Sequence, residues 1–271
     1  MHNTRAWILP LFFLTVFFSL PVFAVQTIAS CGTTVTENAV LGNDLSYAFS
    51  AACVTIGVDN VVLDCGGRKL SGNNRQGTGI YLENRSGVTV KNCVVTSFTN
   101  GIYLRNSTAS QLLYNSLYAN VNGIFLHSSV NNTISNNSAY GNTNYGIRID
   151  SATSPVPSSS NIIANNSAYS NLLDGISLRS ATNNVLSNNS VYSNAQYGIS
   201  MQSAQNNLLS NNSVSGSQNG FYASSSYFNV FANNSAFSNS RGFYIQISDS
   251  NTLSGNSVYG NTGDGVWVDS V

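Results

Sequence analysis

The sequence predicts an all-β solenoid, a parallel β-helix with an asparagine ladder and coils of about 22 residues. Three observations predict this fold: a glycine-led repeat, very short apolar runs between turn residues, and a regular column of asparagines. No window of the chain shows a sustained helical period. Strands this short are stable only when successive coils stack and share a continuous core.

Each repeat begins with a glycine that is followed by alternating apolar residues. The starts are Gly79, Gly101, Gly123, Gly146, Gly175, Gly198, Gly220, Gly242 and Gly265. Successive starts are 22, 22, 23, 29, 23, 22, 22 and 23 residues apart. Propeller blades need about 40 residues and leucine-rich repeats need a different Leu and Asn pattern, so the spacing favours one β-helix coil per unit.

Asparagine pairs recur between the apolar runs, as in SNNSVYSN from Ser187 to Asn194. The second asparagine of the pair is replaced by Cys93 in the first unit and is kept in the others: Asn115, Asn137, Asn166, Asn189, Asn212, Asn234 and Asn256. Because an amide can bond to the same group one coil away, we predict that this column is an asparagine ladder. We also expect its members to take the left-handed bend between two strands, which asparagine tolerates.

The first 24 residues read as a secretory signal peptide. Arg5 precedes a long apolar run, and Val22 to Ala24 offers a cleavage site. The alternative is an uncleaved anchor, because the apolar run is nearly long enough to span a bilayer. We therefore expect a signal peptide at 1–24, an N-terminal cap with the first coils at 25–78, and β-helix repeats with an incomplete last coil at 79–271.

The four cysteines lie in the first third of the chain, and three pairings are open from their number alone. An even count in an exported protein favours disulfides, and the spacing is unlike that of a metal site. Cys65 and Cys93 fall in corresponding turns, LDC and KNC, one coil apart. We therefore predict the disulfides Cys65–Cys93 and Cys31–Cys53.

The composition limits the partners. Ten basic and ten acidic residues give zero net charge, and the absence of a basic patch argues against nucleic-acid binding. A hydrophobic content of 42% favours a packed core over disorder. His127 is the only histidine after the predicted signal peptide. The available metal ligands of the softer kind would be this histidine, Met201 and cysteines that we expect to be bonded to each other. We therefore expect no metal and no other cofactor.

The glycine-led units with NNxISNN-like turns resemble right-handed parallel β-helix repeat proteins. This superfamily includes pectin-lyase-like and carbohydrate-binding/sugar-hydrolase domains, and the periplasmic NosD-like proteins of nitrous-oxide reductase maturation. The segments VVLDCGGRKLSG and GVTVKNCVVTSF resemble the first coils of many exported proteins of this kind. The resemblance covers roughly residues 54–271 and implies a single-stranded right-handed β-helix. It implies no particular activity, because the superfamily shares its coils and not its chemistry.

Two positions of the repeat carry candidate functional residues. The third position should point outward and reads Tyr81, Tyr103, Phe125, Arg148, Ser177, Ser200, Tyr222, Tyr244, Trp267. The fifth position reads Glu83, Arg105, His127, Asp150, Arg179, Gln202, Ser224, Gln246, Asp269. Exposed aromatics suit sugar rings, although aromatics also favour strands for structural reasons. We expect Glu83 beside Arg105 and Asp150 beside Arg179, as ion pairs of little energetic weight.

A second aromatic column follows the predicted ladder: Tyr118, Tyr140, Tyr169, Tyr192, Phe237 and Tyr259. Binding sites rarely repeat so evenly along a solenoid. We therefore expect this column to be structural.

These observations favour a secreted, cell-surface or periplasmic rod that binds a polysaccharide or cell-surface glycan without catalysis. The expected binding residues are Tyr81, Glu83, Tyr103, Arg105, Phe125 and His127. Catalysis is disfavoured because acids are scarce and unpaired. The alternative is a polysaccharide lyase, hydrolase or epimerase in which His127, Arg148 and Asp150 form an acid–base set. A structural envelope protein or a NosD-like periplasmic factor is the third hypothesis.

The sequence stops at GVWVDSV, inside a repeat unit. An open coil exposes an unpaired sheet edge, which invites association. We therefore expect either end-to-end self-association or a missing C-terminal continuation.

Overall fold

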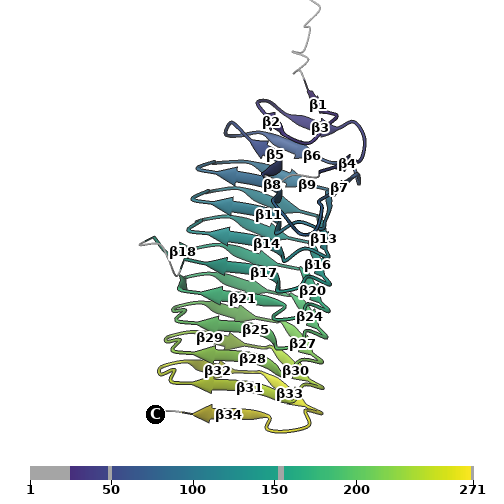
Figure 1. Cartoon of the computed structure of the whole chain (residues 1–271). Coiled ribbons are helices and arrows are strands. Elements are labelled where there is room, and N and C mark those ends of the chain that lie inside the picture. Colours follow the sequence, from purple (N-terminus) through teal and green to yellow (C-terminus); the bar gives the residue numbers. More distant parts are fainter. Residues whose placement is uncertain (1–24, 48–50, 152–155, 270–271) are drawn as a thin grey trace, which may run out of the picture.

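The computed structural model describes residues 25–47, 51–151 and 156–269, and the predicted signal peptide lies outside these ranges. The described residues form 34 strands and no helix, so none of their segments is a helix that could cross a membrane. The coils stack into a rod along which the chain advances from one end to the other (Figure 1). The predicted parallel β-helix is confirmed.

Each coil contributes one short strand to each of three parallel sheets, which we call A, B and C. Sheet A contains β1 (Gln26–Ile28), β3 (Ala39–Leu41), β6 (Val62–Asp64), β9 (Thr89–Lys91), β12 (Gln111–Leu113), β15 (Thr133–Ser135), β19 (Ile162–Ala164), β23 (Val185–Ser187), β26 (Leu208–Ser210), β29 (Val230–Ala232) and β32 (Thr252–Ser254). Sheet B contains β2 (Thr33–Val35), β5 (Ala52–Ile56), β8 (Thr78–Glu83), β11 (Asn100–Arg105), β14 (Asn122–His127), β17 (Tyr145–Asp150), β21 (Ile176–Arg179), β25 (Tyr197–Gln202), β28 (Asn219–Ser224), β31 (Arg241–Gln246) and β34 (Val266–Asp269). Sheet C contains β4 (Leu45–Ser46), β7 (Lys69–Ser71), β10 (Val94–Thr96), β13 (Ser116–Tyr118), β16 (Ser138–Tyr140), β20 (Ser167–Tyr169), β24 (Ser190–Tyr192), β27 (Ser213–Ser215), β30 (Ser235–Phe237) and β33 (Ser257–Tyr259). A further pair, β18 (Ser158–Ser159) and β22 (Ala181–Thr182), lies outside these sheets.

The sheets pair equivalent residues of successive coils, so that Tyr103 lies opposite both Tyr81 and Phe125. Alternate residues point inward and form one continuous apolar core along the rod. The repeat glycines belong to this interior. A Cβ atom on Gly123 would lie 2.5 Å from the carbonyl oxygen of Gly146, so a larger residue would push adjacent coils apart.

The predicted asparagine ladder is present and buried at the corner between sheets A and C. The Nδ2 of Asn137 donates to the Oδ1 of Asn166 at 3.0 Å and to the carbonyl oxygen of Leu112 at 2.8 Å. In the first unit, the backbone N–H of Cys93 donates to the Oδ1 of Asn115 at 3.0 Å. The side-chain amide of Asn137 therefore bonds to the coil before it and to the coil after it.

The expectation that the ladder asparagines take the left-handed bend is wrong. The positive φ angles fall on the residue before each of them, for example 57° at Asn136 and 57° at Tyr114. This arrangement leaves the ladder residue free to turn its amide inward, while the exposed residue before it reverses the chain. The same position is Gly255 in the last unit, with φ of 64°.

Two further asparagine ladders occupy the other corners, and the sequence reasoning missed both. The ladder between sheets C and B contains Asn120, Asn142, Asn171 and Asn194, and after Ser217 it continues with Asn239 and Asn261. The ladder between sheets B and A contains Asn132, Asn161, Asn184, Asn207, Asn229 and Asn251. The recurrent YxN segments, such as Tyr140 to Asn142, were the available signal for the former.

The structure contains the two predicted disulfides, Cys31–Cys53 and Cys65–Cys93, and no free cysteine among the described residues. Cys65 and Cys93 lie in the turns that follow β6 and β9. The two disulfides therefore link neighbouring coils at the N-terminal end of the rod.

Candidate functional site

The outer face of sheet B carries the third-position column. The rings of Tyr81 and Tyr103 lie 5.4 Å apart, and those of Tyr103 and Phe125 are stacked at 4.9 Å with an interplanar angle of 6°. The guanidinium of Arg148 lies 4.8 Å above the Phe125 ring. Because the ring faces cover one another, the ring edges and the phenol oxygens are what this block offers to a ligand.

The fifth-position column lies beside these rings. Arg105 and Glu83 form the predicted ion pair at 3.2 Å. Asp150 and Arg179 are neighbours in register, but the ion pair of Asp150 is with Arg148, two residues earlier in the same strand. The Nε of Arg148 donates to Asp150 Oδ2 at 3.1 Å, and its Nη2 contacts the same oxygen. Arg179 takes part in none of the ion pairs found among the described residues.

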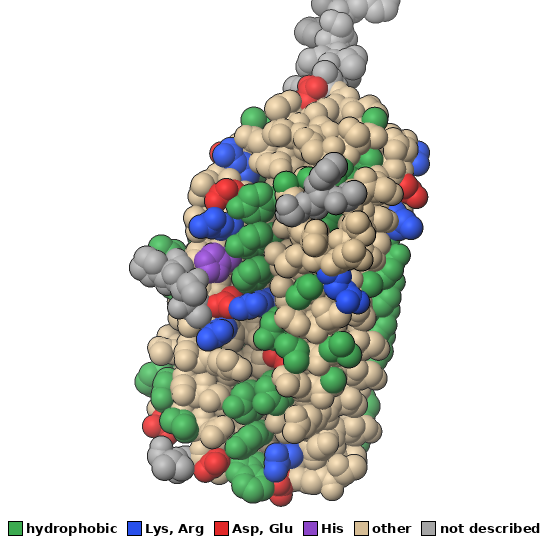
Figure 2. All heavy atoms as spheres, viewed as in Figure 1, with side chains coloured by type: hydrophobic (Ala, Val, Ile, Leu, Met, Phe, Trp, Pro, Cys, Tyr) green, Lys and Arg blue, Asp and Glu red, His purple; other side chains and the backbone are tan. Residues whose placement is uncertain are grey.

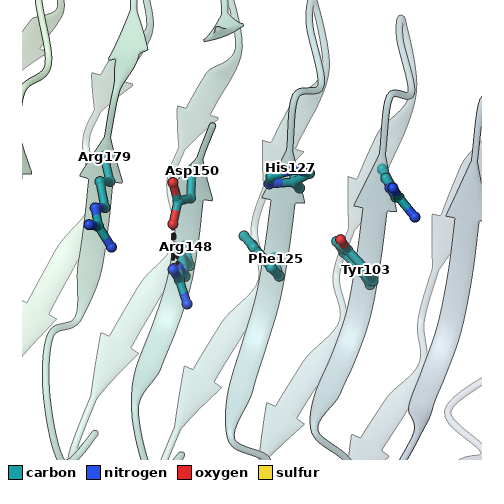
Figure 3. A pocket seen from close by; sticks show the side chains of 7 residues that line it. Tyr103, Phe125, His127, Arg148, Asp150 and Arg179 are labelled. Carbon is teal, nitrogen blue, oxygen red and sulfur yellow. Dashed lines mark hydrogen bonds and ion pairs between the residues drawn. The ribbon is translucent and has the colours of Figure 1, made fainter. Parts of the chain in front are cut away.

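These columns enclose a depression of about 400 Å³ on the outer face of β11, β14, β17 and β21 (Figure 3). Its lining residues are Tyr103, Arg105, Phe125, His127, Arg148, Asp150 and Arg179. The depression thus brings together four of the six predicted binding residues and all three of the alternative acid–base set. Tyr81 and Glu83 lie one strand away and contact it through Tyr103 and Arg105. Arg179 was not among the predicted site residues.

The depression is electropositive. Ion pairs with carboxylates offset the charges of Arg105 and Arg148, whereas the exposed charge of Arg179 has no such counterpart in the described part of the chain. Burial raises the pKa of the Tyr103 phenol, and burial together with the Glu83 carboxylate raises the pKa of Tyr81. Both phenols are therefore neutral hydrogen-bond donors at physiological pH.

A buried carboxyl lies farther along the same face. The third-position residues Ser177 and Ser200 were expected to face solvent, but both are buried. Ser200 donates to Asp174 Oδ2 at 2.6 Å, and the hydroxyls of Ser177 and Ser200 lie 2.9 Å apart. Asp174 is 3% exposed, and its Oδ1 has no hydrogen-bond partner among the residues that the structure describes. Burial raises the pKa of Asp174 to about 6 despite the hydroxyls of Ser200 and Ser177.

The donor groups do not fit a metal centre. Within the described ranges, no three His, Cys, Asp or Glu side chains are grouped in a way that could hold a metal ion. The four thiols form disulfides, and the Met201 thioether is fully buried in the core. The soft ligands that copper prefers are therefore engaged elsewhere.

Comparisons with known proteins agree with the fold. The family described as periplasmic copper-binding protein (NosD) matches residues 33–200, and the right handed beta helix region matches residues 154–270. The A-module of Azotobacter vinelandii mannuronan C-5 epimerase AlgE4 is similar in structure, with a TM-score of 0.70, 14% identity, and coverage of 92% of this chain and 89% of that chain.

Two other solved structures are similar over most of this chain. A variant of the periplasmic alginate epimerase AlgG has a TM-score of 0.62 and 15% identity, and covers 88% of this chain and 76% of that chain. The Dettilon tailspike protein gp208 has a TM-score of 0.67 and 16% identity, with coverage of 90% and 60%. At such low identity the likeness shows the fold alone. No curated protein sequence is significantly similar to the chain.

Proposed function

Since the chain belongs to the NosD family, which matches more than half of its length, we propose that it is an extracytoplasmic rod that binds an acidic polysaccharide on sheet B. The description of the NosD family and the name of the AlgG structure both use the word periplasmic. Two disulfides also favour an oxidising compartment. The predicted signal peptide at 1–24 would direct export.

The depression on sheet B is the observation that carries this proposal. Its lining combines phenol and imidazole groups, which can hydrogen-bond to sugar hydroxyls, with guanidinium groups that can bind a carboxylate in a bidentate manner. Arg179 is the group best placed to bind an anion, because no carboxylate of the described residues forms an ion pair with it. The similar folds of epimerases named for mannuronan and alginate are consistent with a polysaccharide ligand.

Copper binding does not follow from membership of the family. The family description names copper, but the described thiols and the thioether of Met201 are unavailable as ligands, and His127 stands without a second histidine among the described residues. We therefore assign no step of the proposed function to a metal.

The test is a binding panel with the exported protein. Mannuronan, polygalacturonate and hyaluronan are compared with dextran and cello-oligosaccharides by calorimetry. We expect binding to at least one acidic polymer, weakened by added salt. Arg179→Gln should weaken it at least about tenfold, which is the cost of losing one charge-assisted hydrogen bond. Arg68→Gln is the matched control, since Arg68 is exposed in a turn away from the depression. Equal binding of neutral and acidic polymers, or no binding at all, would contradict the proposal.

Modification of the bound polysaccharide is a second candidate function. It is favoured by the position of His127, which lies in register between Arg105 and Asp150 with Tyr103 in the same depression. These groups could move a proton at a sugar carbon or oxygen. Proton NMR of each bound polymer after long incubation would reveal lysis, hydrolysis or epimerisation. If the variants His127→Ala and Asp150→Asn form as much product as the wild type, these two residues do not transfer the proton.

A further inference from the structure

We infer that the break in the aromatic column of sheet C is a binding site for one small, uncharged aromatic ring that carries a hydroxyl group. The column runs from Tyr118 to Tyr192 and is interrupted by Ser215. It resumes with Phe237 and Tyr259. Figure 2 shows hydrophobic side chains in a row along the edge of the rod where Figure 1 places sheet C. The site is separate from the depression on sheet B and does not depend on the proposed function.

The missing side chain leaves a gap of one ring between Tyr192 and Phe237. Ser215 is in register with both residues, so their positions are two coils, or about 9.6 Å, apart. Adjacent rings of this column stack at 4.7 to 5.3 Å, so a ring midway in the gap would have the same spacing to each side. A ring of the size of a tyrosine side chain therefore fits the gap, because the register of this coil matches that of its neighbours and only the side chain differs.

Each of the two rings beside the gap has one covered face. Tyr192 stacks on Tyr169 with an interplanar angle of 4°. Phe237 stacks on Tyr259 with an angle of 3°. Across the described ranges, no further ring or guanidinium lies over Tyr192 or Phe237. Tyr192 is accordingly 38% exposed, more than Tyr169, which has a ring on either side. A flat ring in the gap would stack on two aromatic faces at once.

The same coil also interrupts the asparagine ladder at the corner between sheets C and B, where Ser217 takes the place of asparagine. The hydroxyl of Ser217 is buried and has no hydrogen-bond partner among the described residues. Gly216 and Ser217 line a groove of about 450 Å³, together with the residues that directly follow Tyr192 and Phe237 in the chain. The groove therefore lies beside the gap, and its volume is in the range of sites for small organic ligands. Two regular columns give up their contacts in one coil, as is typical of a functional site.

The lining of this groove determines the class of ligand. None of its lining residues carries a charge, and Gln218, Ser240 and Thr262 supply hydroxyl and amide groups. An ionised substituent would gain no ion pair there, whereas a hydroxyl group can both donate to these groups and accept from them. The ligand is therefore a phenol-like ring, in contrast to the acidic sugars proposed for sheet B.

The probe for this site is p-cresol, which has the ring and the hydroxyl group of a tyrosine side chain. A titration of the exported protein, followed by NMR, should give a dissociation constant of about 1 mM, because so small a ligand makes few contacts. Ser215→Tyr should fill the gap and lower the affinity at least about tenfold. It should also raise the thermal unfolding midpoint, since it completes the stack. Tyr192→Ser removes one wall of the gap and should weaken binding by a similar factor.

Both variants have precedents in the same column, which holds tyrosine and serine in neighbouring coils. Ser135→Tyr is the matched control, because it adds the same side chain to the outer face of sheet A and should leave the affinity unchanged. No binding of p-cresol up to about 10 mM, or binding that Ser215→Tyr and Tyr192→Ser leave unchanged, would overturn the site. Tighter binding of methyl β-D-glucoside than of p-cresol would overturn the assignment to an aromatic ring. None of these outcomes bears on the depression of sheet B.

Discussion

Sheets B and C each carry a column of outward aromatic residues, and the two columns differ in regularity. On sheet C, Tyr118, Tyr140, Tyr169 and Tyr192 stack at 5.3, 4.9 and 4.7 Å with interplanar angles of 17, 2 and 4°, and Ser215 then interrupts the column once. On sheet B, the outward column changes from aromatic to charged to serine and back to aromatic. The backbone register is equally regular in both sheets, so the backbone does not cause this difference.

The comparison separates residues that maintain the rod from residues that interrupt it. Identical side chains at every coil gain from contact with their copies above and below, which makes a regular column a source of stability. Each change of residue along the sheet B column loses this contact between identical side chains. The changes coincide with the depression and the buried carboxyl, which supports the proposal that a ligand binds on sheet B and that the column on sheet C is structural.

The largest expected effect is a pH-dependent loss of folding stability caused by the buried carboxyl of Asp174. Its folded pKa of about 6 lies above the usual 3.8, so the folded protein binds the extra proton between these values. The contribution of Asp174 to stability should be fully present below pH 3.8 and should decline by about 3 kcal/mol as pH rises through 6. Asp174→Asn should remove this contribution, so that the difference in unfolding free energy between variant and wild type grows with pH. A constant difference from pH 3.5 to 7.5 would show that the carboxyl titrates normally.

The asparagine ladder provides the next largest effect. Asn189 accepts from Asn166 and donates to Asn212 and to the carbonyl of Ile163, so Asn189→Ala leaves buried groups unpaired at about 1–3 kcal/mol each. Asn188→Ala changes an exposed residue with φ of 55°, and the left-handed strain costs about 1 kcal/mol. Chemical denaturation of both variants measures the difference. Equal losses of unfolding free energy in the two variants would mean that the buried ladder hydrogen bonds add no more stability than the turn residue does.

A paired substitution tests the contrast between the sheets directly. Tyr169→Ser removes two stacked contacts and should lower the unfolding free energy by about 1–2 kcal/mol without affecting polysaccharide binding. Tyr103→Ser should weaken binding of the acidic polymer. Thermal unfolding and calorimetry on both variants distinguish the roles. If Tyr169→Ser also weakens binding, sheet C is not a purely structural face.

The smallest effect is expected at the exposed ion pair. Glu83→Gln removes the partner of Arg105 but should change stability by less than about 1 kcal/mol, because both groups are accessible to water. The freed guanidinium should strengthen binding of an acidic polysaccharide, and this gain should vanish in the double variant with Arg105→Gln. Weaker binding in Glu83→Gln alone would instead indicate that the carboxylate accepts hydrogen bonds from the sugar.

The sequence alone was sufficient to predict the fold, the disulfides and one ladder, because each depends on a spacing that repeats along the chain. Gly123 lies against the carbonyl oxygen of the next repeat glycine, and Asn137 bonds to the next ladder asparagine, so these contacts can be predicted without coordinates. The third-position and fifth-position columns were likewise predicted to share the outer face, and they follow the same strands of sheet B, although Ser177, Ser200 and Asp150 are buried.

Tertiary structure decided the features that depend on how a side chain orients within its column. Arg148 pairs with Asp150 instead of leaving that carboxylate to Arg179, because it lies flat over Phe125 and reaches along its own strand. Asp174 is buried by its surroundings, although its spacing resembles that of the exposed Asp264. Periodicity determines which residues become neighbours, whereas rotamer choice and desolvation determine which of those neighbours pair. Which neighbouring side chains pair is therefore determined only when the coils are packed.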